Sequence, residues 1–88
     1  MSWQLRFKRS AFSELKELPI NVQQRIDDAL QILAFNPHNR ALNIKKLKGQ
    51  ENLFRLRIGD YRVLYEVNNQ VLIIMIVRVG HRKDVYDQ

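Results

Sequence analysis

Residues 53–65 read LFRLRIGDYRVLY and predict how the sheet of this protein is built. Gly59 and Asp60 favour the positive backbone dihedral φ of a tight two-residue turn between antiparallel strands. With that pair at the turn, Arg57 lies directly opposite Arg62. Side chains alternate between the two faces of a strand. The stretch therefore predicts a hairpin with one apolar face and one face that carries arginines.

The two faces of this hairpin predict different environments. The apolar face is expected to join the core and comprises Phe54, Leu56, Ile58, Tyr61, Val63, Tyr65 and Val67. The other face carries Arg55, Arg57 and Arg62, with Glu66 four residues beyond Arg62. Like charges opposed across strands destabilise a sheet by up to about 1 kcal/mol. The cluster therefore favours a bound phosphate, which planar guanidinium groups grip in pairs; the alternative is a basic face whose arginines extend into water.

The rest of the chain predicts one α+β domain over residues 1–88, with the order β-α-α-β-β-β. Periods of two and of about 3.6 residues between apolar positions predict the elements. Strands are expected over about residues 3–8, 53–58, 61–67 and 71–79, and helices over about 10–18 and 22–35. Residues 38–52 are polar and predict a loop. Two helices would then pack on one face of a mostly antiparallel four-stranded sheet, and the other face would have no cover within the chain.

A second two-residue link, Asn68-Asn69, predicts another tight hairpin. In that register Met75 lies beside Arg62. Residues 71–77 are apolar at every position, which predicts a strand buried on both faces. Three of them would form an apolar strip on the arginine face, namely Ile73, Met75 and Val77. An apolar strip beside a basic patch suits a protein partner as well as RNA.

The composition restricts the classes of function. Against 9 acidic residues the chain has 15 lysines and arginines, a net charge of +6 that suits a polyanionic partner. Without cysteine, disulfides, thiolate catalysis and cysteine-based zinc sites are excluded. Neither a phosphate-binding glycine loop nor a metal-ligand spacing occurs, so we expect no cofactor and no metal.

The apolar run 71–77 is far shorter than the roughly 20 residues that span a bilayer, and no signal-peptide pattern opens the chain. We expect a cytoplasmic protein with no membrane partner.

The C-terminal segment adds candidate site residues. Gly80 permits a sharp turn that would bring His81, Arg82 and Tyr86 back toward the sheet. His81 and His38 are the two side chains that ordinarily titrate near neutrality, and His38 is more typical of a plain loop residue. Tyr86 would either stack on a base or cap the core. Further basic residues that suit contacts with an RNA backbone are Lys45, Lys46, Lys48 and Lys83.

Three segments together resemble the RelE/ParE superfamily of toxins, in its RelE-like ribonuclease branch. They are LKG at 47–49, the hairpin at 53–65 and VGHRKDVY at 79–86, in this order and spacing. The resemblance covers nearly the whole chain. It implies a type II toxin that enters the ribosomal A site and cuts mRNA without a metal, the ribose 2′-hydroxyl attacking the adjacent phosphate to leave a cyclic phosphate and a 5′-hydroxyl. It also implies a cognate RelB-like antitoxin that folds over the toxin, giving a hetero-oligomer.

The resemblance implies a role for each candidate residue. Arg55 and Arg62 would stabilise the phosphorane-like transition state, because fixed donors aimed at developing charge lower its energy. Arg82 would lie by the leaving oxygen, as a proton donor or an electrostatic substitute for one. Tyr86 would stack on a nucleotide and hold the attacking hydroxyl in line.

Arg57 departs from the family pattern, in which a lysine acts as general base. Arginine stays protonated in proteins and does not readily accept a proton at neutral pH. We therefore expect Arg57 to clamp phosphate, while His81 or a group on the ribosome handles the proton.

Three other functions remain open from the sequence. A ParE-like toxin shares the fold but inhibits DNA gyrase by protein contact, and the Arg57/Arg62 pair with the His81, Arg82 and Tyr86 ending argues against it. A passive nucleic-acid-binding module would need the basic face but not His81 or Tyr86. An inactivated relative, kept for antitoxin binding, is compatible with Arg57 in place of lysine.

Overall fold

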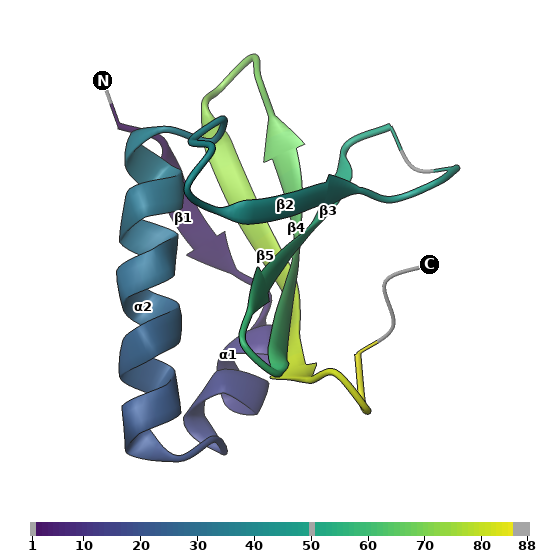
Figure 1. Ribbon diagram of the computed structural model, residues 1–88. Coiled ribbons are helices and arrows are strands. Elements are labelled where there is room, and N and C mark those ends of the chain that lie inside the picture. The colour runs from purple at the N-terminus through teal and green to yellow at the C-terminus, as the bar shows by residue number, and fades with distance from the viewer. Residues whose placement is uncertain (1, 50, 86–88) are drawn as a thin grey trace.

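The computed structural model describes residues 2–49 and 51–85 of the chain. Its elements are β1 (Gln4–Phe7), α1 (Arg9–Lys16), α2 (Ile20–Phe35), β2 (Asn43–Lys46), β3 (Leu53–Ile58), β4 (Tyr61–Asn68) and β5 (Ile73–His81). The strands of this described part form one five-stranded sheet in the order β1-β5-β4-β3-β2. β1 runs parallel to β5, and the other neighbouring pairs are antiparallel. Both helices lie on the same side of this sheet (Figure 1), which confirms the predicted α+β class.

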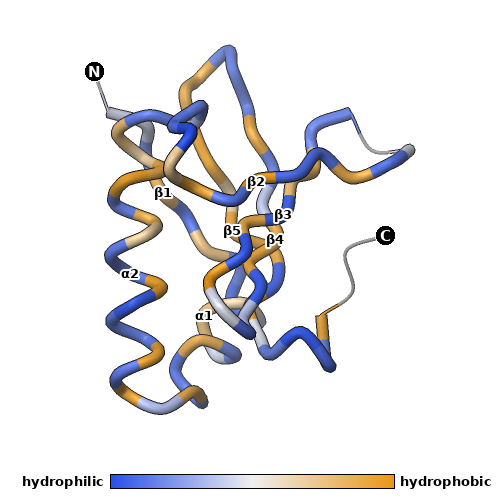
Figure 2. Tube along the Cα trace, in the orientation of Figure 1, coloured by the Kyte–Doolittle hydropathy of each residue, from blue (hydrophilic) through white to orange (hydrophobic). Residues whose placement is uncertain are grey.

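The core lies between the helices and one face of the sheet. In α2, buried residues recur at helical spacing, and Figure 2 shows hydrophobic and hydrophilic segments alternating along this helix. The buried cluster comprises Ala11, Leu15, Val22, Ile26, Leu30, Leu33, Leu56, Val63, Tyr65, Ile74, Ile76 and Val79. Burying one large aliphatic side chain contributes roughly 1.5–3 kcal/mol, so this layer stabilises the fold. It also fixes which face of β3 and β4 points away from the helices.

The first predicted hairpin is confirmed. β3 and β4 pair Ile58 with Tyr61 and Arg57 with Arg62, with Gly59 at a positive φ of 57° in the turn. The side chains predicted for the apolar face of both strands contact the core, as expected from their alternation. The arginines therefore lie on the outer face of the sheet, the face opposite the helices.

Strand β2 was not expected, because residues 38–52 were predicted to form a loop. It pairs antiparallel with β3, with Asn43 opposite Arg57 and Lys45 opposite Arg55. As an edge strand of four residues it has one neighbour, and of its side chains only Ile44 packs against the core. Short edge strands with exposed polar residues show little apolar alternation. The predicted four-stranded sheet therefore has a fifth strand.

The predicted two-residue hairpin at Asn68-Asn69 is wrong. Asn68 pairs with Ile73, so residues 69–72 form the turn. The side-chain oxygen of Asn68 accepts hydrogen bonds from the backbone N–H groups of Gln70 (3.0 Å) and Val71 (3.4 Å), which favours this longer turn. Leu72 completes it with a positive φ of 54°.

The longer turn changes the register of β5. Met75 pairs with Glu66 instead of lying beside Arg62, and Arg62 pairs with Gly80. The register also shifts between Leu64 and Tyr65, where β5 contains one extra residue. Such bulges bend a strand and redirect its side chains. The basic and apolar parts of the outer face are therefore further apart than the sequence predicted.

The outer face is partly covered by the chain itself, contrary to the expectation that it would be bare. Leu47, Leu64 and Val85 are buried there in a second cluster, with Leu53 and Val77 packed against it. Val85 comes from the segment that follows β5. This small cluster holds the C-terminal segment against the sheet, next to the arginines of β3 and β4.

Candidate active site

Arg57 and Arg62 converge on the turn of the β3–β4 hairpin. Nη1 of Arg62 donates hydrogen bonds to the carbonyl oxygens of Gly59 and Tyr61, both at 3.0 Å. Nε of Arg57 donates to the same Gly59 oxygen at 3.4 Å. Arg62 is 8% exposed, whereas Arg57 is exposed. Both guanidinium groups thus donate to one backbone carbonyl, Arg62 from a buried position and Arg57 from an exposed one.

Arg55 is oriented by the strand that the sequence did not predict. Its Nη2 donates to the side-chain oxygen of Asn43 (2.5 Å) and to the backbone oxygen of that residue (3.5 Å). Arg55 is buried at 8% exposure. Asn43 is therefore a site residue that the sequence analysis missed. The sequence signal that could have predicted strand β2, and with it Asn43, is the weak alternation of polar and apolar residues around Ile44.

Arg82 approaches the same hairpin turn from the segment after β5. Its backbone N–H donates to the carbonyl oxygen of Asp60 at 2.7 Å, and its Nε lies 3.9 Å from a carboxylate oxygen of Asp60. Both side chains are more than half exposed, and such surface pairs contribute little to stability. Arg57, Arg62 and Arg82 therefore all contact the Gly59-Asp60 turn.

The segment that carries Arg82 packs against the outer face of the sheet. The chain turns after His81, whose carbonyl oxygen accepts hydrogen bonds from the N–H groups of Asp84 (2.8 Å) and Val85 (3.1 Å). The expected turn at Gly80 is wrong, because Gly80 lies within β5. A Cβ atom on Gly80 would lie 2.9 Å from Cγ2 of Val85. The absence of a side chain at Gly80 is therefore what lets Val85 pack there.

His81 lies away from the arginine pair. Its ring packs edge-to-face against Tyr61, with centroids 5.5 Å apart, and the two residues are paired across β4 and β5. Tyr61 belongs to the core-facing side, whereas Arg57 and Arg62 are on the outer side. Nδ1 of His81 accepts a hydrogen bond from the backbone N–H of Lys83 at 3.1 Å. The visible role of His81 is thus to cap the turn that follows it.

The remaining predicted site residues are dispersed. His38 is exposed in the loop after α2, where its N–H donates to the Asn36 side chain. Tyr86 lies outside the described residues. All four predicted RNA-binding lysines are exposed. Lys45, directly opposite Arg55, continues the arginine face, Lys83 adjoins Arg82, and Lys46 and Lys48 line a shallow depression at the loop between β2 and β3.

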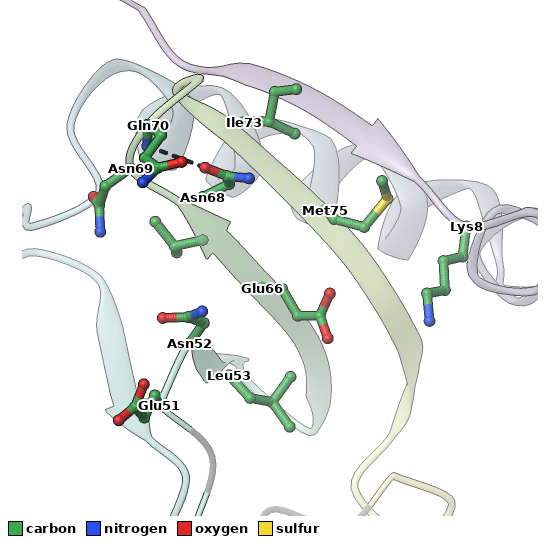
Figure 3. A pocket seen from close by; sticks show the side chains of 11 residues that line it. Lys8, Glu51, Asn52, Leu53, Glu66, Asn68, Asn69, Gln70, Ile73 and Met75 are labelled. Atoms are coloured by element: carbon green, nitrogen blue, oxygen red, sulfur yellow. Dashed lines mark hydrogen bonds between the residues drawn. The ribbon is translucent and has the colours of Figure 1, made fainter.

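A groove of about 850 Å³ occupies the other end of the outer face (Figure 3). Ile73 and Met75 of the predicted apolar strip line it, whereas Val77 packs in the second cluster. Glu51 and Glu66 also line the groove. Glu66 is four residues along β4 from Arg62, or roughly 13 Å at the usual rise of a strand. The groove is therefore separate from Arg62, and its lining of two carboxylates and one lysine, Lys8, does not favour a phosphate.

The titration of the site reflects burial and neighbouring charge. Burial raises the pKa of the Tyr65 hydroxyl far above its usual value, and the positive charge of Arg55 lowers it only partly.

Within residues 2–49 and 51–85, no three His, Asp or Glu side chains are grouped so that they could hold a metal ion. In the same ranges no helix is long and apolar enough to cross a membrane.

Known proteins with similar sequences are toxins. Residues 5–86 match the family model described as the ParE toxin of the type II toxin–antitoxin system parDE. Toxin RelE3 of Methanocaldococcus jannaschii is 35% identical over 83 residues, 92% of each chain. Toxin RelG of Mycobacterium tuberculosis is 34% identical over 89 residues, 98% of each chain.

Solved structures show the same fold. The archaeal RelE–RelB complex of Pyrococcus horikoshii contains a chain that superposes with a TM-score of 0.81 at 28% identity, covering 97% of this chain and 100% of that one. The RelB–RelE antitoxin–toxin complex of Methanococcus jannaschii gives a TM-score of 0.76 at 35% identity, covering 93% and 95%.

Proposed function

Because this chain belongs to the RelE/ParE superfamily and is a toxin of a type II toxin–antitoxin system, we propose that it acts as a ribosome-dependent mRNA endoribonuclease. The observation that carries the proposal is the convergence of Arg57, Arg62 and Arg82 on the Gly59-Asp60 turn. The three arginines outnumber the Asp60 carboxylate, which lies 3.9 Å from Nε of Arg82, and this excess of positive charge supports binding of a phosphodiester at the turn. A toxin with this proposed activity would act in the cytoplasm, where mRNA is translated.

The proposed reaction is a transesterification within the RNA chain. The 2′-oxygen attacks the adjacent phosphorus, the bond from phosphorus to the 5′-oxygen breaks, and the products carry a 2′,3′-cyclic phosphate and a 5′-hydroxyl. The attacking hydroxyl loses a proton, and the leaving oxygen gains one. Negative charge develops on the phosphoryl oxygens between these events, so fixed donors that bind the transition state more tightly than the substrate accelerate the reaction.

The geometry favours a division of roles among the arginines. Arg62 is fixed by two backbone carbonyls and Arg55 by Asn43, so both can act as preorganised donors to the phosphoryl oxygens. Arg57 is exposed and clamps the phosphate. Arg82 is at the rim of the cluster, suited to the leaving oxygen. Tyr86 stacks on a nucleotide in this proposal, as the family resemblance implies.

The base that accepts the proton is proposed to be a group on the ribosome. Arg57 remains protonated at neutral pH and cannot take this role. The ring of His81 packs on Tyr61, on the helix side of the sheet, and its Nδ1 already accepts the Lys83 N–H. A base supplied by the ribosome would also make cleavage depend on the ribosome.

The partner of the free toxin is its antitoxin. Similar toxins have been solved as complexes with RelB antitoxins, and we propose that a RelB-like antitoxin forms a hetero-oligomer with this chain. A net charge of +6 favours an acidic segment in that partner. The bound antitoxin would keep the arginine face away from mRNA.

Inhibition of DNA gyrase is the second candidate, because the matching family model is that of ParE. Primer extension on mRNA from a translating extract, run beside a gyrase supercoiling assay, separates the two. We expect wild-type protein to introduce strong stops within the mRNA, Arg82→Ala to weaken them, and supercoiling to continue normally. Inhibited supercoiling with intact mRNA would establish the ParE-like activity and exclude the nuclease.

A further inference from the structure

An ion pair connects helix α1 with strand β5. Nε of Arg78 donates hydrogen bonds to both carboxylate oxygens of Glu14, at 3.1 and 3.4 Å. The same carboxylate accepts the backbone N–H of Val79 at 2.9 Å. The extra residue of the β5 bulge lets both Ile76 and Val79 lie in the core. Arg78, between them, then reaches the helix. Glu14 thus fixes both the side chain of Arg78 and the backbone beside it.

The other end of the Arg78 guanidinium contacts the segment that carries Arg82. Its Nη2 donates to the carbonyl oxygen of Asp84 at 3.3 Å. Asp84 is two residues beyond Arg82, whose own N–H is bound to the Asp60 carbonyl. The turn at 82–84 is therefore held at one end by the β3–β4 hairpin and at the other by Arg78.

We propose that Glu14 and Arg78 are positioning residues for Arg82, which transmit the position of α1 to the candidate active site. The proposal rests on the proposed function, in which Arg82 acts at the leaving oxygen. A planar guanidinium presents donors in a fixed fork, so one Arg78 side chain can bind Glu14 and Asp84 simultaneously. A lysine ammonium is a single point charge on a flexible stem and cannot reproduce this bridge.

The bridge is not a major stabilising element of the fold. The side chains of Arg78 and Glu14 are 45% and 30% exposed. Ion pairs at this exposure contribute little to stability because solvent screens them. Its main effect is therefore geometric, on the place of the turn that carries Arg82.

Two variants, one that removes a charge and one that keeps it, separate positioning from simple electrostatics. Glu14→Gln removes a negative charge from a basic protein, so electrostatics alone predicts tighter binding to ribosomes programmed with mRNA. Positioning instead predicts that kcat falls about tenfold with little change in KM, since small misplacements of a reacting group are costly. Arg78→Lys keeps the charge, and the same loss is expected. Glu17→Gln removes the same charge from an exposed position at the end of α1 and should cleave like wild type.

A double-mutant cycle and an RNA-free measurement complete the test. In an Arg82→Ala background, Glu14→Gln and Arg78→Lys should cause no further loss of kcat, because both act through Arg82. Amide hydrogen exchange at Arg82, Asp84 and Val85 should be at least about fivefold faster in both variants. Losses that add to that of Arg82→Ala, or unchanged exchange, would overturn the proposal. Wild-type protein that leaves mRNA intact refutes the proposed nuclease, while the exchange measurement still decides the positioning.

Discussion

Arg57 and Arg62 face each other across the β3–β4 hairpin, and both donate a hydrogen bond to the carbonyl oxygen of Gly59. Opposed like charges in a sheet cost up to about 1 kcal/mol. The shared acceptor aims both guanidinium groups at the turn, where Asp60 binds the backbone of Arg82. A phosphodiester bound at this turn would contact both guanidinium groups, and this contact is the physical basis of the proposed activity.

Removing either Arg62 or Arg82 should reduce mRNA cleavage at least about tenfold, because each supplies a charge-assisted donor to the reacting phosphate. The variants Arg62→Ala and Arg82→Ala should keep a wild-type circular dichroism spectrum. Arg40→Ala, an exposed arginine in the loop after α2, is the matched control and should retain activity. Full cleavage by both site variants would remove these residues from the mechanism.

Gly59→Ala and Gly49→Ala should lose similar stability but differ in activity. Both glycines have a positive φ, 57° and 75°, and alanine in that region costs about 1–2 kcal/mol. A Cβ at Gly59 would also lie 2.7 Å from Nη2 of Arg25, but this atom ends a flexible side chain that can move aside at little cost; the space at Gly49 is open. Because the Gly59 carbonyl orients Arg57 and Arg62, only Gly59→Ala should slow cleavage. Urea unfolding and a cleavage assay measure the two effects, and equal activities would contradict the role of this carbonyl.

His81→Ala should leave the pH dependence of cleavage unchanged. The imidazole caps the Lys83 N–H and packs on Tyr61, so its removal loosens the turn but takes away no base. We expect a modest fall in kcat and the same profile as wild type between about pH 5.5 and 8. If a rise of kcat with pH in the wild type disappears in His81→Ala, then His81 is the general base.

Tyr65→Phe should be less sensitive to alkaline pH than wild type. Burial raises the pKa of the Tyr65 hydroxyl, so the folded state holds this proton more tightly than the unfolded state does. Its contribution to stability is therefore complete below the ordinary pKa of 10.0 and is lost as pH rises above it. The free energy of unfolding in urea should fall more steeply above about pH 10 in wild type than in the variant. Parallel curves would show that Tyr65 does not contribute.

The sequence predicted the β3–β4 hairpin correctly because its information is local. Gly59 and Asp60 fix the turn, and strict alternation on both strands fixes the register. Helix α2 was predictable for the same reason, since its buried residues recur at helical spacing and Asn36-Pro37 ends it. The positions of Arg57 and Arg62 beside the turn followed directly from this hairpin, whereas that of Arg82 did not.

The features that were missed depend on contacts distant in sequence or on competing turns. Strand β2 forms because β3 offers an edge to Asn43–Lys46, not because those residues have a strong pattern of their own. The Asn68 side chain favours a longer turn than the Asn-Asn pair alone suggested. The bulge in β5 and the bridge from Glu14 to Asp84 depend on packing against α1. None of these is encoded in a short periodic stretch.

The decisive measurement uses programmed ribosomes and two mRNAs that differ only at the nucleotide 5′ to the cut, which carries either a 2′-hydroxyl or a 2′-O-methyl group. Wild-type protein should cut the first mRNA, leaving a 2′,3′-cyclic phosphate, and should leave the second intact, while Arg62→Ala should cut neither efficiently. Equal cleavage of both mRNAs, or undiminished cleavage by Arg62→Ala, would contradict attack by the 2′-hydroxyl at a phosphate held by the arginine cluster.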